Sequence, residues 1–268
     1  GPAEGAGGLV KPNYRDTARA FDAVAPTYDA IYGPAGNAVM TWMRRESLAL
    51  LKATFPRGDY LLEIGCGTGE EAVALATSGR RVLATDISPK MAALTQAKAR
   101  DLELADHVRA VAVPAAGLEA LEPPTHFDGA YASFGALNCE PRLDRLGAAL
   151  ARLIRPGGAF VCSVMGRCCP FEMAWFLLHG RPRVAFRRLY RGWQSAPVAG
   201  PENVQISVVT RYLTVRDVEQ AFSPAFVVER TLSLPLFLPP PYLDGVFRRY
   251  RGFFGAVEYL ERQLRHRW

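Results

Sequence analysis

Cysteine is scarce in this chain of 268 residues, and the five that occur (Cys66, Cys139, Cys162, Cys168 and Cys169) show no C-x-x-C spacing. The sequence therefore indicates neither a zinc site nor a disulfide framework. Long hydrophobic runs are also lacking, since no stretch approaches the roughly eighteen apolar residues that a membrane span requires. No secretory signal pattern opens the sequence. From these absences we expect a cytoplasmic protein without a transmembrane span.

The composition is that of a globular protein with a basic excess. Hydrophobic residues make up 49% and charged residues 22% of the chain, which is enough to bury a full α/β core and one additional cap or lid. The net charge of +6 comes from arginine, which is concentrated in residues 181–191 and 248–267. Basic patches with interleaved aromatic residues can bind RNA, anionic lipid or an acidic substrate, and solvated helix faces have the same composition.

A glycine-rich turn follows the first apolar run. Residues 61–69 read LLEIGCGTG, and Asp86 ends the next apolar run, residues 82–85. An apolar run of this kind predicts a buried parallel strand, and alternating glycines let a ligand approach the backbone. An acid at the tip of the neighbouring strand can accept hydrogen bonds from a ribose. The pattern therefore predicts a nucleoside pocket.

The residue after the third glycine decides which nucleotide fits. A dinucleotide fingerprint needs G-x-G-x-x-G, but Gly69 is followed here by Glu70. A carboxylate at the start of the helix also repels a pyrophosphate. A cofactor without phosphates is therefore favoured.

These motifs resemble the class I S-adenosylmethionine-dependent methyltransferases, and the resemblance covers residues 14–165. The matching stretches are residues 63–69, residues 85–88 with Met91, and the strand pair 126–133 and 158–165. Residues 20–29 are similar to the N-terminal segment of small-molecule members, including the quinone-biosynthesis methyltransferases.

The resemblance implies S-adenosyl-L-methionine as cofactor, S-adenosyl-L-homocysteine as its product, and a role for each matching residue. Glu63 would face the methionine amino group, and Asp86 would accept both ribose hydroxyls. The methionine portion would lie along Gly65, Cys66, Gly67, Thr68 and Gly69, the adenine between Ile87 and Met91, and the transferred methyl beside Ser133 and Phe134. Tyr28 would cover the methionine end or pack within the N-terminal helices. Residues 114–116 contain no acid for the adenine amino group, so backbone or water must supply that contact.

Strands and helices alternate from residue 60 to residue 164, which predicts an α/β, Rossmann-like doubly wound, mainly parallel sheet. We expect a disordered tail over residues 1–12, a helical cap over 13–55, the cofactor-binding core over 56–165, an inserted helical lid over 166–202, and further strands and a final helix over 203–268. The resemblance implies a seven-stranded sheet whose last strand is antiparallel. No such strand follows the helix expected at residues 242–265, so either residues 203–213 take an edge position or the sequence has been trimmed. Residues 226–234 alternate like another strand.

The acceptor is less clearly indicated than the cofactor. The loop after the fourth strand lacks the Asn/Asp-Pro-Pro-Tyr/Phe motif of relatives that methylate bases or amide nitrogen, which disfavours those acceptors. His179 in the lid is the predicted general base, with Glu172 as a comparable alternative. The aromatic residues of the lid indicate a small, apolar or lipid-like acceptor methylated at oxygen or carbon, unless they only bury one another.

Three alternatives stay open. The arginine-rich lid and C-terminal helix could bind RNA as the methyl acceptor. The chain could instead be a non-catalytic, methyltransferase-like module that contacts a partner or a membrane surface through residues 166–193. Aminopropyl transfer on the same fold is a minor option. The sequence specifies neither the acceptor atom nor an oligomeric state.

Overall fold

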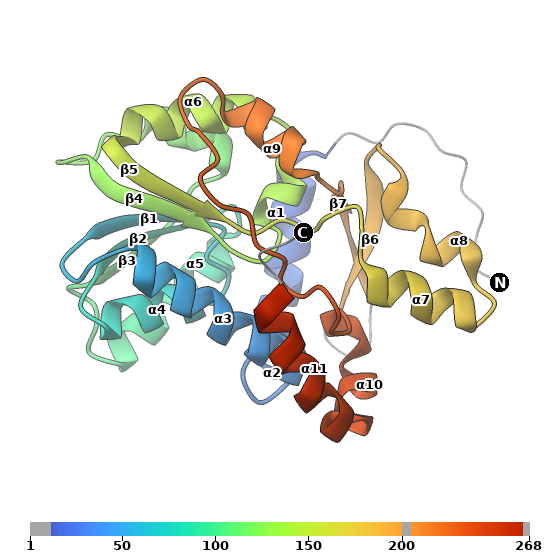
Figure 1. Ribbon diagram of the computed structural model, residues 1–268. Helices are drawn as coiled ribbons and strands as arrows, with labels where there is room; N and C mark the ends of the chain where they lie inside the picture. The colour runs from blue at the N-terminus through green and yellow to red at the C-terminus, as the bar shows by residue number, and fades with distance from the viewer. Residues whose placement is uncertain (1–11, 200–204, 265–268) are drawn as a thin grey trace.

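The computed structural model describes residues 12–199 and 205–264, which build a parallel sheet covered by helices on both faces (Figure 1). The strands are β1 (Tyr60–Ile64), β2 (Arg81–Asp86), β3 (Val108–Ala112), β4 (Phe127–Ala132) and β5 (Ile154–Cys162). Their order in the sheet is β3-β2-β1-β4-β5, and every neighbouring pair is parallel. The predicted doubly wound α/β fold is confirmed. Its strand order reverses between β1 and β4, where such sheets bind ligands.

Each face of the sheet has its own hydrophobic cluster. Leu61 and Val82 point to one side, where α3 (Ala38–Thr54), α4 (Glu70–Thr77) and α5 (Pro89–Asp101) pack. Leu62 and Leu83 point to the other side, where η2 (Ala115–Ala120), α6 (Leu143–Leu153) and α9 (Val215–Phe222) pack. Successive strand residues thus contribute to opposite faces, as the pleat requires. Both faces are buried, which explains why the strands read as continuous apolar runs.

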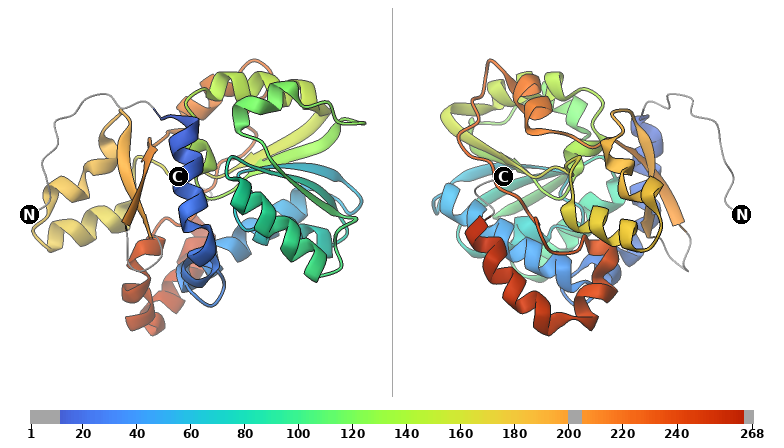
Figure 2. Two further views of the ribbon diagram at one scale, coloured as in Figure 1. Left: turned by 180° about the vertical axis from the view of Figure 1, so that it is seen from behind. Right: turned by 45° about the vertical axis from the view of Figure 1, so that its right-hand side comes forward.

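The N-terminal cap is helical. It contains α1 (Tyr14–Val24), η1 (Ala25–Thr27), α2 (Tyr28–Tyr32) and α3. Asn13 and Asn37 are the N-caps of α1 and α3, and their side chains accept hydrogen bonds from backbone N–H groups of the first turn. Helix α1 packs against both α5 and β7 (Gln205–Thr210), so it lies between the central sheet and the lid region (Figure 2).

The segment after β5 is helical only in its first part. It forms α7 (Pro170–Leu178), α8 (Pro182–Ala185) and η4 (Arg187–Leu189), and then a strand, β6 (Gln194–Ala199). β6 pairs with β7 in a separate antiparallel sheet. The edge position considered for residues 203–213 is therefore wrong for β7, because β7 pairs with β6; Leu213 forms an isolated parallel bridge with Gly166, just after β5. Residues 200–204 lie outside the described residues, as does nearly all of the tail expected over residues 1–12.

The strand expected at residues 226–234 is also wrong. Val227 and Val228 are exposed, and the segment pairs with no described strand, so its alternating pattern buries no face. The central sheet consequently has five strands among the described residues, where the resemblance implied seven.

The final helix is divided in two. After η6 (Pro241–Leu243) the chain forms α10 (Asp244–Arg249) and α11 (Arg251–Leu264). Phe247 and Phe254 of these helices pack against Val39 and Trp42 of α3. Asp244 accepts hydrogen bonds from the backbone N–H groups of Ala38 and Val39 and so caps α3 from outside. The C-terminal helices are thus part of the support for the N-terminal cap.

Candidate functional site

The glycine turn after β1 is held in left-handed conformations that favour glycine. Gly65, Gly67 and Gly69 have φ values of +73°, +54° and +82°. The N–H groups of Gly65 and Cys66 both donate to the carbonyl oxygen of Thr85, at 2.8 and 2.9 Å. These bonds fasten the turn to the end of β2, so the carboxyl ends of both strands meet at one place.

The three glycines differ in what surrounds them. A Cβ at Gly65 would lie 2.5 Å from Ala136 Cβ, and one at Gly69 would lie 2.6 Å from Thr95 Cγ2. At Gly67 the nearest heavy atom would be Tyr28 Cε1, at 4.0 Å. Gly65 and Gly69 therefore allow close packing of the protein, whereas Gly67 leaves its backbone approachable. A ligand can reach the turn at Gly67.

Asp86 joins the glycine turn to the start of α5. Its Oδ2 accepts a hydrogen bond from Gly67 N and its Oδ1 one from Ser88 N, both at 2.8 Å. Burial raises the pKa of Asp86 to about 6, although the hydrogen bonds from Ser88 and Gly67 favour the ionised form. A carboxylate oxygen accepts more than one hydrogen bond, so Asp86 can serve the turn and the hydroxyls of a ligand together.

Glu63, on β1, is a buried carboxyl group short of partners. It is 1% exposed, and its Oε2 has no hydrogen-bond partner among the described residues. Burial, and after it the charge of Glu71, raises the pKa of Glu63 well above its usual value; Asp86 adds to this, and Tyr131 opposes it. Unpartnered buried charge is costly in a folded protein. A cationic group between these three acids would stabilise them.

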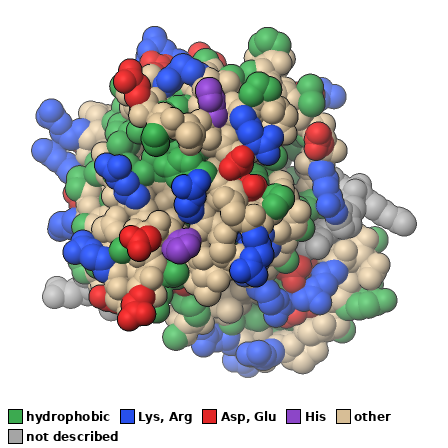
Figure 3. Space-filling view, turned by 90° about the vertical axis from the view of Figure 1, so that its left-hand side faces the viewer, with side chains coloured by type: hydrophobic (Ala, Val, Ile, Leu, Met, Phe, Trp, Pro, Cys, Tyr) green, Lys and Arg blue, Asp and Glu red, His purple; other side chains and the backbone are tan. Residues whose placement is uncertain are grey.

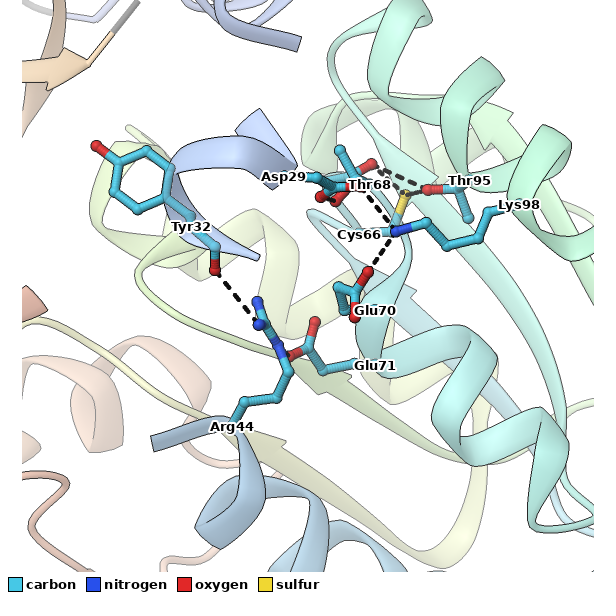
Figure 4. A network of polar contacts seen from close by, with 10 residues as sticks. Asp29, Tyr32, Arg44, Cys66, Thr68, Glu70, Glu71, Thr95 and Lys98 are labelled. Atoms are coloured by element: carbon cyan, nitrogen blue, oxygen red, sulfur yellow. Dashed lines mark hydrogen bonds and ion pairs between the residues drawn. The ribbon is translucent and has the colours of Figure 1, made fainter. Parts of the chain in front are cut away.

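One arginine enters this acidic region, and the sequence analysis missed it. Arg44 Nε donates to Glu71 Oε1 at 2.7 Å, and its guanidinium lies 5.7 Å from the centre of the Phe134 ring. Arg44 Nη1 also donates to the Tyr32 carbonyl oxygen at 3.4 Å. Figure 4 shows Arg44 reaching from α3 toward Glu71 at the start of α4. No sequence signal separates Arg44 from its charged neighbours Arg45 and Glu46 in the same helix.

The N-terminal helices are fastened to the same turns through two aspartates. Asp29 accepts hydrogen bonds from Thr68 Oγ1 and from Lys98 Nζ, and Lys98 also pairs with Glu70 (Figure 4). Asp22 accepts hydrogen bonds from Ser88 Oγ and Lys90 N at the start of α5. The cap thereby closes over the glycine turn from one side.

The structure gathers the other predicted cofactor residues around this turn. Tyr28 lies against Gly67, and burial raises its pKa above the usual value. Met91 is buried in a cluster with Val24 and Ala25, and half-buried Ile87 directly follows Asp86. Cys66 and Thr68 are buried within the turn.

The turn after β4 forms the opposite wall. Ser133 and Phe134 are half-buried, and Phe134 has a φ of +50°, a conformation uncommon for a residue other than glycine. Its N–H donates to Ser163 Oγ at 2.6 Å, which holds the turn in place. The contact between Gly65 and Ala136 sets this wall against the glycine turn.

His179 is not brought to this site. It is exposed at the end of α7, with Nδ1 2.7 Å from the Trp175 carbonyl oxygen and its ring 4.2 Å from the Trp175 ring. Figure 1 shows α7 projecting away from the sheet. Its general-base role therefore has no support in this geometry.

The other candidate base, Glu172, is held in ion pairs with two arginines. Its Oε1 accepts a hydrogen bond from Arg187 Nε and its Oε2 one from Arg188 Nε, both at 2.9 Å. The second arginine-rich segment is partly paired as well, since Arg248 pairs with Asp244 and Arg262 with Glu46. Four arginines of the two basic segments are thus used in ion pairs within the molecule.

The site has the features that S-adenosyl-L-methionine requires. Its sulfonium and amino groups are cationic, and the site contains three buried acids, one of which, Glu63, has a carboxylate oxygen without a hydrogen-bond partner in the described part of the chain. The approachable backbone at Gly67 and the acceptor Asp86 suit the rest of a nucleoside. Within residues 12–199 and 205–264, no group of three or more His, Cys, Asp or Glu residues could hold a metal ion.

Comparison with known proteins supports the same assignment. A family model described as a methyltransferase domain matches residues 61–158. The ubiquinone/menaquinone biosynthesis C-methyltransferase UbiE of Acidiphilium cryptum is 30% identical over 149 residues, which cover 55% of this chain and 57% of that protein. The 27-O-demethylrifamycin SV methyltransferase of Amycolatopsis mediterranei is 30% identical over 162 residues, covering 56% of this chain and 58% of that protein. The chain thus spans somewhat more than half the length of these curated relatives.

Solved structures show the fold. The CcbJ methyltransferase of Streptomyces caelestis superposes with a TM-score of 0.60 at 20% identity, covering 82% of this chain and 91% of that one. The residues matched by the family model include β1, the glycine turn and Asp86, around which the site is built. Residues 61–158 therefore form a methyltransferase domain, and this part of the chain is similar to the class I S-adenosylmethionine-dependent methyltransferases.

Proposed function

We propose that this chain transfers the methyl group of S-adenosyl-L-methionine to an oxygen or carbon atom of a small, apolar or lipid-like acceptor. The observation that carries the proposal is the buried, partly unpartnered Glu63 beside Glu71 and Asp86 at the open backbone of Gly67. This arrangement suits a cationic nucleoside without phosphates. The names of two relatives, a quinone C-methyltransferase and a rifamycin methyltransferase, support a small acceptor.

Each end of the cofactor has a partner of suitable chemistry in this proposal. Glu63 accepts hydrogen bonds from the methionine amino group, and Asp86 accepts them from the ribose hydroxyls. Arg44 provides a positive charge for the methionine carboxylate, because its guanidinium lies beside Glu71, near the start of α4, and has more donors than its contacts with Glu71 and Tyr32 use. Ile87 and Met91 lie on either side of the adenine.

The bound cofactor supplies an activated methyl group on a sulfonium, which is already a good leaving group. The work left to the chain is to align the acceptor and exclude water, and alignment can account for roughly 7–11 kcal/mol of a barrier. Tyr28 and the helices fastened by Asp22 and Asp29 cover the methionine end of the cofactor. Ser133 and Phe134 form the wall beside the methyl group.

The acceptor proton has no assigned base in this site. His179 is exposed at the end of α7, and Glu172 is occupied by Arg187 and Arg188. We therefore infer that the acceptor reacts through a nucleophile that has lost its proton before it binds, such as an enolate or a phenolate. RNA as acceptor is less favoured, because several of the arginines that would bind phosphates pair with carboxylates instead.

The test is incubation of the full chain with methyl-labelled cofactor and fractionated apolar metabolites, followed by mass spectrometry. The expected result is label in a low-mass apolar product and conversion of the cofactor to S-adenosyl-L-homocysteine. Asp86→Ala, assayed in parallel, should abolish the transfer, because its loss removes the ribose acceptor. Calorimetry with S-adenosyl-L-homocysteine separates two ways in which the proposal can fail. If the protein binds this compound but methylates only RNA, the proposed acceptor class is wrong. If the protein does not bind it, the whole proposal is refuted.

A further inference from the structure

The outer end of the segment after β5 exposes large apolar side chains to solvent. We call residues 177–191, which comprise the end of α7, α8, η4 and the residues between and after them, the lid tip. Its exposed apolar side chains are Leu177, Leu178, Phe186, Leu189 and Tyr190. Leu178 is 85% exposed, so it packs against almost nothing in the chain. Figure 1 shows α7 and α8 side by side at the edge of the molecule, away from the sheet.

The charge exposed on the lid tip has one sign only. From residue 173 to residue 201 the sequence has no aspartate or glutamate, whereas the lid tip itself has five arginines. Arg187 and Arg188 pair with Glu172, which is fully buried, but Arg181, Arg183 and Arg191 are exposed. The face at the other side of the molecule, seen in Figure 3, has acidic side chains among its basic ones.

Contacts with two tyrosines hold the lid tip in position. The Arg188 guanidinium lies 5.0 Å from the centre of the Tyr212 ring, and the Arg187 guanidinium lies 5.3 Å from that of Tyr242. The pairs with Glu172 thus join η4 to α7, and the two ring contacts join η4 to the segments after β7 and before α10. The exposed leucines and arginines are presented on a fixed support.

We propose that the lid tip docks on an anionic lipid surface. Exposed leucines beside unpaired arginines match such a surface, because the apolar side chains enter the acyl boundary while the arginines attract anionic headgroups. RNA fits less well, since three of the five exposed apolar side chains are leucines, which do not stack on bases. Docking of this kind is peripheral, as no described helix is long and apolar enough to cross a membrane. It does not depend on methyl transfer.

The test is flotation of the full chain with vesicles of phosphatidylcholine alone or with added phosphatidylglycerol, without cofactor. The expected result is binding to the phosphatidylglycerol vesicles that weakens as salt rises. Arg183→Glu and Arg191→Glu should each weaken binding roughly fivefold or more, which is the contribution of one arginine near an anionic surface. Leu178→Asp should weaken it roughly tenfold, because the inserted leucine is lost.

Two surface variants elsewhere serve as matched controls. The side chain of Val227 is 82% exposed, a fraction similar to that of Leu178. Arg216 is exposed on α9, which Figure 1 shows at another part of the surface. Val227→Asp and Arg216→Glu should leave vesicle binding unchanged. The proposal is overturned if phosphatidylglycerol vesicles are not bound, if the controls weaken binding as much as the lid-tip variants, or if single-stranded RNA is bound while vesicles are not.

Discussion

Arg44 Nε lies 2.7 Å from Glu71 Oε1, and this buried ion pair joins the N-terminal cap to the first helix after the glycine turn. The side chains are 10% and 7% exposed. Desolvation alone would lower the pKa of Arg44, but the charge and hydrogen bond of Glu71 outweigh it and raise the pKa. Each buried charge is therefore stabilised by the other. Removing one of them would leave its partner buried without a compensating charge.

Arg44→Ala should consequently destabilise the fold. Removing one partner of a buried pair typically costs roughly 3–5 kcal/mol, because the other charge is left uncompensated. Here Glu71 would be left beside Glu63, whose pKa is already raised by burial and, after it, by the charge of Glu71. Urea unfolding measures the change. Arg45→Ala is the control: Arg45 is 57% exposed, and a surface pair contributes at most about 1 kcal/mol. Equal losses in the two variants would show that the Arg44 pair has no special weight.

The raised pKa of Asp86 predicts opposite pH effects on binding and on stability. Asp86 accepts the ribose hydroxyls as a carboxylate, so affinity for S-adenosyl-L-homocysteine should fall as the pH drops through about 6, approaching tenfold per pH unit. The stability of the cofactor-free protein should change in the opposite direction. Asp86 binds its proton more tightly in the folded state than in the unfolded state, so the contribution of Asp86 to the free energy of unfolding falls as pH rises from 3.8 to about 6.

Calorimetry at several pH values, together with chemical unfolding of the free protein, separates these effects. Asp86→Asn should weaken binding at neutral pH by roughly tenfold to a hundredfold, the weight of a charge-assisted hydrogen bond. It should also remove the Asp86 component of both pH dependences. A wild-type affinity that does not change across pH 6 would mean that the carboxylate form is not required.

The sequence predicted the central sheet because its information is local. Apolar runs and glycine breaks mark β1 to β5, and LLEIGCGTG with Asp86 marked the turn where the site lies. The role of Arg44 was not predicted because its partner Glu71 lies on another helix, and no local sequence pattern indicates such a pair. The strand expected at residues 226–234 failed for a related reason: alternation describes a strand only where a neighbour is present to pair with it.

Gly69→Ala should disturb both the fold and cofactor binding. Its φ of +82° is left-handed, which costs an alanine roughly 1–2 kcal/mol. The new methyl would also lie 2.6 Å from Thr95 Cγ2, and overpacking of this kind adds about 1–3 kcal/mol. Thr95 Oγ1 donates to the Gly67 carbonyl oxygen at 2.9 Å, so displacing Thr95 moves the turn itself.

Gly58→Ala separates these contributions. Gly58 has a similar φ of +92°, but nothing lies within 4 Å of its Cβ position. Gly58→Ala should lower the free energy of unfolding only by the backbone strain and leave binding of S-adenosyl-L-homocysteine unchanged. Gly69→Ala should lower the free energy of unfolding further and bind this compound more weakly. If both variants bind normally, the fit of Gly69 against Thr95 does not control the cofactor turn.

Glu172→Gln should lower the free energy of unfolding of the protein without affecting cofactor binding. Burial alone would raise the pKa of Glu172, but the hydrogen bonds and charge of Arg188 outweigh it and hold the pKa below its usual value. A lowered pKa in the folded state means that the stabilising contribution is complete above the unfolded value of 4.5 and is lost as pH falls through the folded value. The variant should therefore lose roughly 3 kcal/mol at neutral pH, since two arginines would face a neutral amide.

The matched control for Glu172 is Glu258, whose side chain is 29% exposed and pairs with Arg45 at 3.6 Å. Glu258→Gln should change the free energy of unfolding by at most about 1 kcal/mol. The difference between the two variants should shrink in acid, because protonation removes the Glu172 contribution from the wild-type protein as well. A Glu172→Gln variant as stable as the wild type at neutral pH would show that Arg187 and Arg188 find other partners, and that the lid does not depend on this carboxylate.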